Sequence, residues 1–243
     1  MIRRLVPPPR PPRGGGGAGP TRRALLCGAA LTVLAWGLPA PLAASAPASP
    51  PLFEPEDGQK LSYAIVRLGS RIGLHHFTFQ RRDGRLVVES DLTISVSILS
   101  IQVYALNHKS REVWEDGRLV WFSGATNDDG TIHRAQSELR GDRLHVVTDG
   151  EVKDSPPLFV ASLWRALPTD TRVAIDPIDG DPTSFSVAAG PDETVKVRGE
   201  PRRAQRWTWR GGINRDLWYD PSGLLVRVLI KGDDGSDVFY ILQ

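Results

Sequence analysis

Few side chains in this 243-residue chain could do chemistry, and the most conspicuous are two adjacent histidines. His75 and His76 suggest a metal site at first sight, because imidazole is the commonest metal ligand in proteins. Neighbouring residues of a strand point to opposite faces, however, so the two rings cannot bind one ion. The other histidines complete no metal-binding motif: they are His108, His133 and His145. The sequence therefore predicts neither a metal site nor a cofactor.

The carboxylates lack a catalytic or calcium-binding arrangement. Residues 127–129 and 233–237 are rich in aspartate, but neither segment has the calcium-loop spacing with a closing glutamate. Turn formation by Asp-Gly explains both segments. The chain also contains no nucleophile elbow, no Ser-x-x-Lys motif and no phosphate-binding loop. We predict a protein that is not an enzyme and has no catalytic residues. A hydrolase whose acids come together only in three dimensions is the third of our hypotheses.

The tryptophans offer a different chemistry, the binding of an apolar ligand. Trp207 and Trp209 share one face of a predicted strand, and Trp218 lies just before a turn. Together with Trp114 they are the candidates to line a ligand groove, because large aromatic side chains can line an apolar site. The same residues can fill the inside of a curled sheet, and we favour that interpretation.

The first 46 residues have the layout of an export signal. Arg22 and Arg23, followed by Leu25 and Leu26, resemble a twin-arginine translocation signal. The apolar run at residues 24–38 is shorter than the roughly 20 residues that a membrane-spanning helix needs. A small-residue region then predicts cleavage after Ala46, with Ala48 as the alternative. The general secretory route is the alternative to the twin-arginine route.

Export would make the export machinery and signal peptidase partners of this chain and place the mature protein in the periplasm. The only cysteine, Cys27, would leave with the signal, so the mature chain has no disulfide. Six of the 30 basic residues also precede the cleavage region, whereas all 28 acidic residues follow it, which gives the mature part a net charge of −4. Such a domain does not attract nucleic acid. The densest basic cluster, at residues 202–210, is interpreted as a strand edge protected by charge in preference to a phosphate site.

The mature chain is predicted to be all-β. Asp-Gly pairs recur between segments of strand length, which indicates hairpins of an antiparallel meander. After a linker at 47–58, we expect a single domain at 59–243, built as a curved antiparallel sheet or half-open β-barrel with one short helix. The helix is predicted at 158–167 from its apolar spacing. The predicted strands lie at 61–68, 74–81, 86–98, 111–116, 118–123, 131–139, 143–148, 172–175, 183–187, 194–198, 205–209, 214–219, 224–230 and 238–242.

The clearest strand alternates so regularly that it assigns side chains to faces. Along residues 86–98 the apolar residues take even positions, so Ile94 should be buried and Thr93 should face water. After Ile98 the apolar residues move to odd positions, beginning with Leu99. We interpret this phase change as a β-bulge or corner that bends one long strand.

Two segments carry a resemblance to a known family. Residues 216–226 (DLWYDPSGLLV) with 234–242 (DGSDVFYIL), and Val103-Tyr104 leading to 112–120 (EVWEDGRLV), resemble an uncharacterised family of exported Gram-negative envelope proteins, a domain of unknown function. The resemblance extends from about residue 61 to 242. More remotely, the chain is similar to periplasmic lipoprotein carrier and receptor proteins, which implies a curled sheet over an apolar cavity. It implies no catalytic residues.

Two binding hypotheses therefore precede the hydrolase. The first is a non-catalytic periplasmic protein that binds an acyl or lipid-like ligand in the concave face of its sheet. The second is an envelope scaffold or interaction module whose interior is packed. The oligomeric state is not predicted.

Replacing Arg22 and Arg23 together with lysine tests the export route. The twin-arginine receptor requires the arginine pair itself, whereas the general route requires only positive charge. We therefore expect Arg22→Lys with Arg23→Lys to block accumulation in the periplasm, measured by cell fractionation. Normal accumulation of this double variant would instead assign the chain to the general secretory route.

Overall fold

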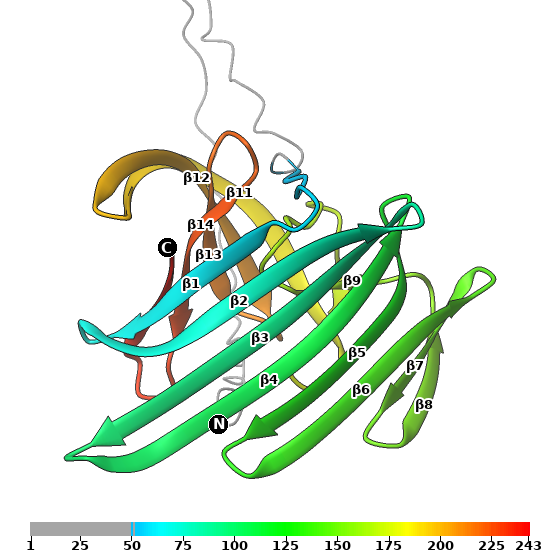
Figure 1. Cartoon of the computed structure of the whole chain (residues 1–243), viewed down its shortest axis with the longest axis horizontal. Helices are drawn as coiled ribbons and strands as arrows, with labels where there is room; N and C mark the ends of the chain where they lie inside the picture. The colour runs from blue at the N-terminus through cyan, green and yellow to red at the C-terminus, as the bar shows by residue number, and fades with distance from the viewer. Residues whose placement is uncertain (1–49, 51) are drawn as a thin grey trace, which may run out of the picture. The chain divides into compact units, whose positions relative to one another are not determined.

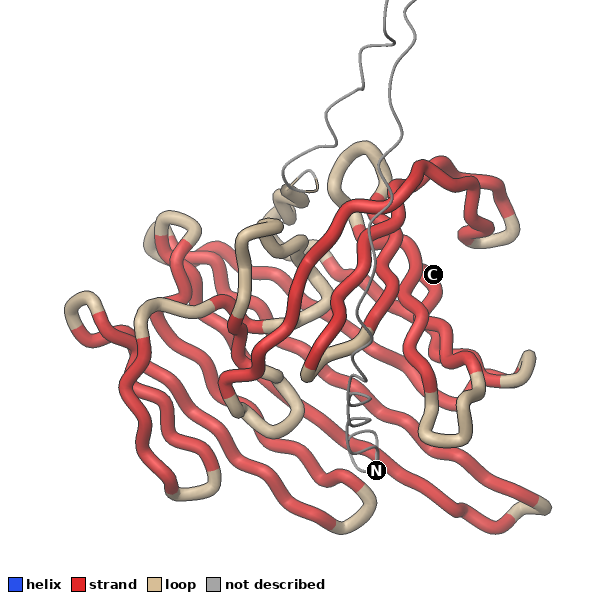
Figure 2. The backbone as a smooth tube through the Cα atoms, turned by 180° about the vertical axis from the view of Figure 1, so that it is seen from behind, coloured by secondary structure: helices blue, strands red, loops and turns tan. Residues whose placement is uncertain are grey.

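The computed structural model describes residues 50 and 52–243, and every regular element in this range is a β-strand. Figure 2 shows strands and connecting loops with no helix in this part of the chain. None of the described residues accordingly forms a helix long and apolar enough to cross a membrane. The predicted all-β class is confirmed, and the strands belong to one large curved sheet (Figure 1).

The strands have the following bounds: β1 Lys60–Arg67, β2 Ser70–Arg82, β3 Arg85–Ile98, β4 Ile101–Glu115, β5 Arg118–Asp128, β6 Thr131–Arg140, β7 Arg143–Thr148, β8 Glu151–Ser155, β9 Phe159–Val160, β10 Val173–Ile175, β11 Pro182–Val197, β12 Glu200–Gly211, β13 Arg215–Tyr219, β14 Leu225–Lys231 and β15 Asp237–Leu242. Their order in the sheet is β8-β7-β6-β5-β4-β3-β2-β1-β15-β14-β13-β12-β11-β10-β9. The first and last strands thus pair in the middle of the sheet, Tyr63 opposite Leu242. All neighbours are antiparallel except β9 and β10, which run parallel.

Asp-Gly pairs form the tight turns, as their chemistry predicts. In four hairpins both residues of the pair have positive φ, the conformation that a two-residue turn of matching twist requires. These pairs are Asp83-Gly84, Asp116-Gly117, Asp129-Gly130 and Asp149-Gly150. They connect four of the six hairpins in the meander from β2 to β8.

The interpretation of Ile98 and Leu99 as a bulge within one strand is wrong. Leu99 and Ser100 both have positive φ and form the hairpin turn between β3 and β4, with Ile98 opposite Ile101. The phase change therefore marks a reversal of the chain. No glycine, asparagine or aspartate stands in this turn, and Ser100 alone is a weak turn signal.

The predicted helix at 158–167 is also not observed. Residues 159–160 form β9, and the chain then continues without regular structure through a stretch in which residues 160–167 are all buried. Ala161 N donates to Ile175 O, which links this stretch to β10. The apolar spacing typical of a helix arises here because the segment is enclosed on every side, and not because it presents one apolar face.

The concave side of the sheet contains a segment of the chain itself. We call residues 156–181, which include β9 and β10, the crossing segment. It lies against the inner face of β5–β7: Thr126 Oγ1 donates to Ile178 O over 2.6 Å, and a Cβ at Gly180 would lie 2.0 Å from the Cβ of Ala135. Only glycine fits this contact, and its φ of +80° also favours glycine. The crossing segment and the sheet share one hydrophobic core.

Ile94 tests the assignment of strand faces. It is buried and Thr93 is exposed, as the alternation predicts. Ile94→Ala should lower the free energy of unfolding by about 2–5 kcal/mol, because burial is lost and a cavity remains. Thr93→Ala should change it by about 0.5 kcal/mol or less. Urea melts measure both, and equal effects would contradict the facing of β3.

Candidate functional site

The most tightly enclosed carboxyl group of the described interior is that of Glu112 on β4. The side chain is 1% exposed. Its Oε2 accepts hydrogen bonds from Trp114 Nε1 at 2.8 Å and from Trp164 Nε1 at 2.9 Å. Trp114 follows Glu112 on the same face of β4, whereas Trp164 belongs to the crossing segment. One carboxylate oxygen therefore joins the sheet to the segment inside it.

A buried arginine completes this arrangement. The guanidinium of Arg165 lies 4.4 Å from the ring centroid of Trp114, 5.3 Å from that of Phe159 and 5.4 Å from that of Trp164. Stacking on aromatic faces stabilises a cation that burial has removed from water. We call Glu112, Trp114, Phe159, Trp164 and Arg165 the inner cluster.

Burial dominates the electrostatics of the inner cluster. It raises the pKa of Glu112, although the indole hydrogen bonds and the charge of Arg165 act in the opposite direction. Burial likewise lowers the pKa of Arg165. The carboxyl is surrounded by indoles and closed to solvent, so it is suited to hold the crossing segment in place rather than to exchange protons with a substrate.

Two buried histidines lie elsewhere in the interior. His75 Nε2 is 2.7 Å from Ser90 Oγ, and His108 Nδ1 is 2.8 Å from Thr126 Oγ1. Because Thr126 donates its proton to the crossing segment, it accepts from His108, which places the proton of that ring on Nδ1. Burial lowers the pKa of both rings, to about 4 for His108, so both are neutral at neutral pH.

The histidine pair shows the predicted opposition of faces. His75 is buried, whereas His76 is exposed on the other side of β2 beside Ser62. Within the described residues, no group of three or more histidine, cysteine or acidic side chains is arranged to hold a metal ion.

The four tryptophans predicted to line a groove are all at most 5% exposed and do not form one surface. Trp114 belongs to the inner cluster. Trp207 and Trp209 lie on the inner face of β12, where Phe185 is 5.3 Å from Trp209 between ring centroids. Trp218 lies on the opposite face of the sheet, since the register places Leu217, and not Trp218, beside Trp207. A groove lined by some of them stays a prediction.

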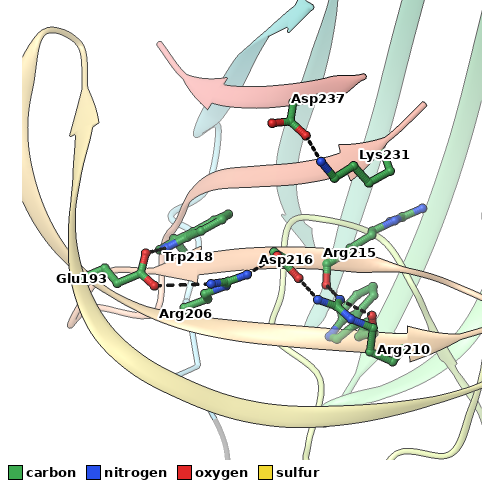
Figure 3. Close-up of polar contacts among 9 residues, drawn as sticks. Glu193, Arg206, Arg210, Arg215, Asp216, Trp218, Lys231 and Asp237 are labelled. Carbon is green, nitrogen blue, oxygen red and sulfur yellow. Dashed lines mark hydrogen bonds and ion pairs between the residues drawn. The ribbon is translucent and has the colours of Figure 1, made fainter. Parts of the chain in front are cut away.

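Trp218 is covered by arginines. The guanidinium groups of Arg206 and Arg227 lie 5.4 and 5.3 Å from its ring centroid, and its Nε1 donates to Glu193 Oε2 over 2.7 Å. Figure 3 shows the hydrogen bond from Trp218 to Glu193 and, beside it, Asp216, which binds both Arg206 and Arg210.

The carboxylates also account for the basic cluster at residues 202–210. Arg202 pairs with Asp220 and Arg203 with Asp192. The four arginines are therefore neutralised by partners on neighbouring segments. The interpretation of this cluster as a strand edge is correct only for Arg202 and Arg203, because residues 200–204 pair with β11 alone, whereas residues 205–209 lie between β11 and β13.

The outer face of the sheet carries a shallow groove of about 770 Å³ that extends over strands β2–β7. Most of the residues that line it are polar or charged, and they include His76, Asp91, Lys109 and Arg111. Lys109 Nζ lies 3.1 Å from Asp91 Oδ2, so some of its charges are already paired.

Sequence reasoning missed the inner cluster, although one signal for it was present. Glu112 and Trp114 share the parity of His108 and Leu106 in β4, which places all four on one face. The partners from the crossing segment carry no such signal. The predicted export residues Arg22, Arg23 and Ala46 lie outside the described residues.

The comparisons with known proteins support the fold and leave the activity open. The family model of a domain of unknown function, DUF6134, matches residues 63–243. The search of the curated proteins finds no match. Among solved structures, a beta-barrel-like protein of the domain of unknown function DUF1849 from Brucella abortus is similar, with a TM-score of 0.52 and 11% sequence identity. The similarity covers 76% of this chain and 94% of that one, and at this identity it concerns the fold alone.

The titration of Glu112 gives the inner cluster a measurable signature. The pKa of Glu112 is raised in the folded protein from its usual value of 4.5, which applies to the unfolded chain. The side chain therefore stabilises the folded state at pH values below 4.5. This stabilisation is lost as the pH rises through the pKa of the folded state. Glu112→Gln keeps an oxygen for the two indoles but cannot ionise. Urea melts at about pH 5 and about pH 8 should therefore show the variant gaining stability relative to the wild type at the higher pH.

Glu112→Ala is the control for this prediction. It leaves two buried indole N–H groups without an acceptor, which costs about 1–3 kcal/mol for each group at either pH. A Glu112→Gln variant with the same pH profile as the wild type would contradict the raised pKa.

Proposed function

The chain belongs to the DUF6134 family, a domain of unknown function, and we propose that it is an exported, non-catalytic binding module that acts through its outer surface. The proposal places the domain in the periplasm after removal of the signal at residues 1–46. It corresponds to a packed interaction module, the second of the hypotheses that the sequence raised.

The position of the crossing segment is the observation that carries this proposal. Its apolar side chains occupy the concave side of the sheet, where a carrier of acyl chains would hold its ligand. Val160, Leu167 and Ile175 are each at most 1% exposed. Removing such side chains from water stabilises the fold by about 1.5–3 kcal/mol each, so a ligand would have to displace a favourable contact.

The interior polar groups support a non-catalytic role. Glu112 binds two indoles, His108 binds Thr126, and His75 binds Ser90. A catalytic acid or base must reach a substrate within hydrogen-bond distance. These groups instead join strands to one another or to the crossing segment.

A carrier of an apolar ligand is the second candidate function. One observation favours it: Trp207 Nε1 and Tyr219 Oη are buried and have no hydrogen-bond partner in the described part of the chain. Buried donors of this kind are usually satisfied. A ligand with a polar head and an acyl chain could supply an acceptor among the aromatic rings of β12 and β13.

Native mass spectrometry distinguishes the two functions. We expect protein purified from cells that express the full chain to have the mass of the polypeptide alone. Added fatty acid should leave tryptophan emission and the melting temperature unchanged, because a ligand stabilises a fold only by binding it. A lipid retained at one copy per chain would favour the carrier. Fatty-acid binding would also favour it if Trp209→Ala weakened that binding by more than its effect on the stability of the fold explains.

A further inference from the structure

Four large aliphatic side chains stand in water at one end of the sheet. Leu68, in the turn between β1 and β2, is 80% exposed, and Leu99, in the turn between β3 and β4, is 92% exposed. Ile101 and Val103 follow in β4 and are 68% and 48% exposed. We call these four residues the aliphatic tips. Both turns follow odd-numbered strands of the meander, so they project from the same end of the sheet (Figure 1).

The two tip leucines occupy backbone positions that do not suit them. Leu68 has φ 49° and Leu99 has φ 50°, in the left-handed region where a side chain with a Cβ is disfavoured. Asp-Gly fills the same kind of turn in four other hairpins of this protein. Neither the backbone nor burial explains a leucine at these positions. Strained residues that the fold does not need are often retained for binding.

The hairpin that bears Leu99 also projects beyond its neighbours. Pairing of β3 with β2 ends at Ile94 opposite Gly73. On the other side, the pairing of β4 with β5 ends at Leu106, and Asp129 N donates to Ala105 O. Residues 97–103 therefore form the end of a two-stranded ribbon that extends beyond the paired parts of its neighbours, while Val96 and Tyr104 at its base pack against the core.

The two aliphatic turns differ in the charges around them: Arg67, beside Leu68, pairs with Asp234 of the acidic turn between β14 and β15, whereas the ribbon that bears Leu99 is uncharged. Residues 95–103 contain no charged side chain, and residues 67–71 contain only Arg67 and Arg71. The turns at the opposite end are densely charged, as residues 81–85 (RRDGR) and 140–143 (RGDR) show. The next two turns at the aliphatic end, at residues 128–132 and 149–153, are acidic. Leu99 and Leu68 are the most exposed large aliphatic side chains of the described residues, whereas Ile132 and Val152 in the two acidic turns are 49% and 59% exposed.

We propose that the aliphatic tips insert into the surface of a lipid bilayer. This inference rests on the proposed function, in which the outer surface of the domain does the binding. The side chains stand on two separate projecting turns, so a protein partner would need two matching sockets, whereas a fluid bilayer needs none. Insertion removes apolar area from water. Ser70, Ser97 and Gln102 then lie at the level of the head groups, and Arg71 can meet a lipid phosphate.

Asparagine at the two leucine positions separates binding from stability. Asparagine tolerates the left-handed conformation, so Leu68→Asn and Leu99→Asn should keep or raise the melting temperature. Each should lower partitioning about tenfold in co-sedimentation with vesicles of equal parts phosphatidylethanolamine and phosphatidylglycerol. Ile132→Asn and Val152→Asn are matched controls, because they change exposed aliphatic residues of the two acidic turns. Both control variants should partition into the vesicles nearly as much as the wild type.

Two results would overturn the bilayer proposal at once: the wild type does not sediment with the vesicles, or the tip variants sediment with them as much as the wild type does. Sedimentation that high salt abolishes would also overturn it, because apolar insertion persists when charges are screened. Concentration-dependent dimers that the tip variants lose would also overturn it and assign the ribbon to a second copy of the chain. All of these results leave the outer-surface module standing. A lipid retained inside the protein, equally by the wild type and the tip variants, would overturn that module.

Discussion

The hydrogen bonds from two indoles to one buried carboxylate hold the interior of this protein together. A long sheet that curls over must fill its concave side, and here the filling is a stretch of chain without regular structure. Such a stretch has few ladder hydrogen bonds of its own, so side chains must fix its position. Glu112 does so by accepting from Trp114 of the sheet and Trp164 of the crossing segment at once. Arg165 packs on the same rings and partly offsets the buried negative charge.

This arrangement leaves different properties on the two sides of the sheet. The side chains of the inner side stabilise the fold, and they include the neutral histidines His75 and His108 and most of the large aromatic residues. The outer side carries paired charges, a shallow polar groove and the arginines that cover Trp218. The ends of the meander differ as well, because one set of turns is charged and two of the opposite turns are aliphatic. Binding at the rim or on the outer face is therefore consistent with the way in which the interior is used.

The solved structure with a similar fold shows how little residue identity this architecture requires. The two chains share the fold over most of their described lengths at 11% identity. A curved meander depends on alternation, on turn residues and on enough large side chains to fill the inside, and many sequences satisfy these conditions. Specific polar contacts such as those of Glu112 are not implied by the shared fold. These contacts are observed in this chain alone, and function must be argued from such sites rather than from the fold.

Local patterns determined the strands, their facing and most turns. Alternation assigned Ile94 and Thr93 to the correct faces, and Asp-Gly located four hairpins, because both signals depend on neighbours in the chain. The same logic failed at Leu99, where the turn contains no glycine, asparagine or aspartate, and at 158–167, where burial on all sides produced the apolar spacing of a helix. Only the tertiary structure decided that the crossing segment lies inside the sheet and that Trp164 meets Glu112. These contacts join residues 52 positions apart, and no local pattern encodes which of several enclosed segments will meet a given strand.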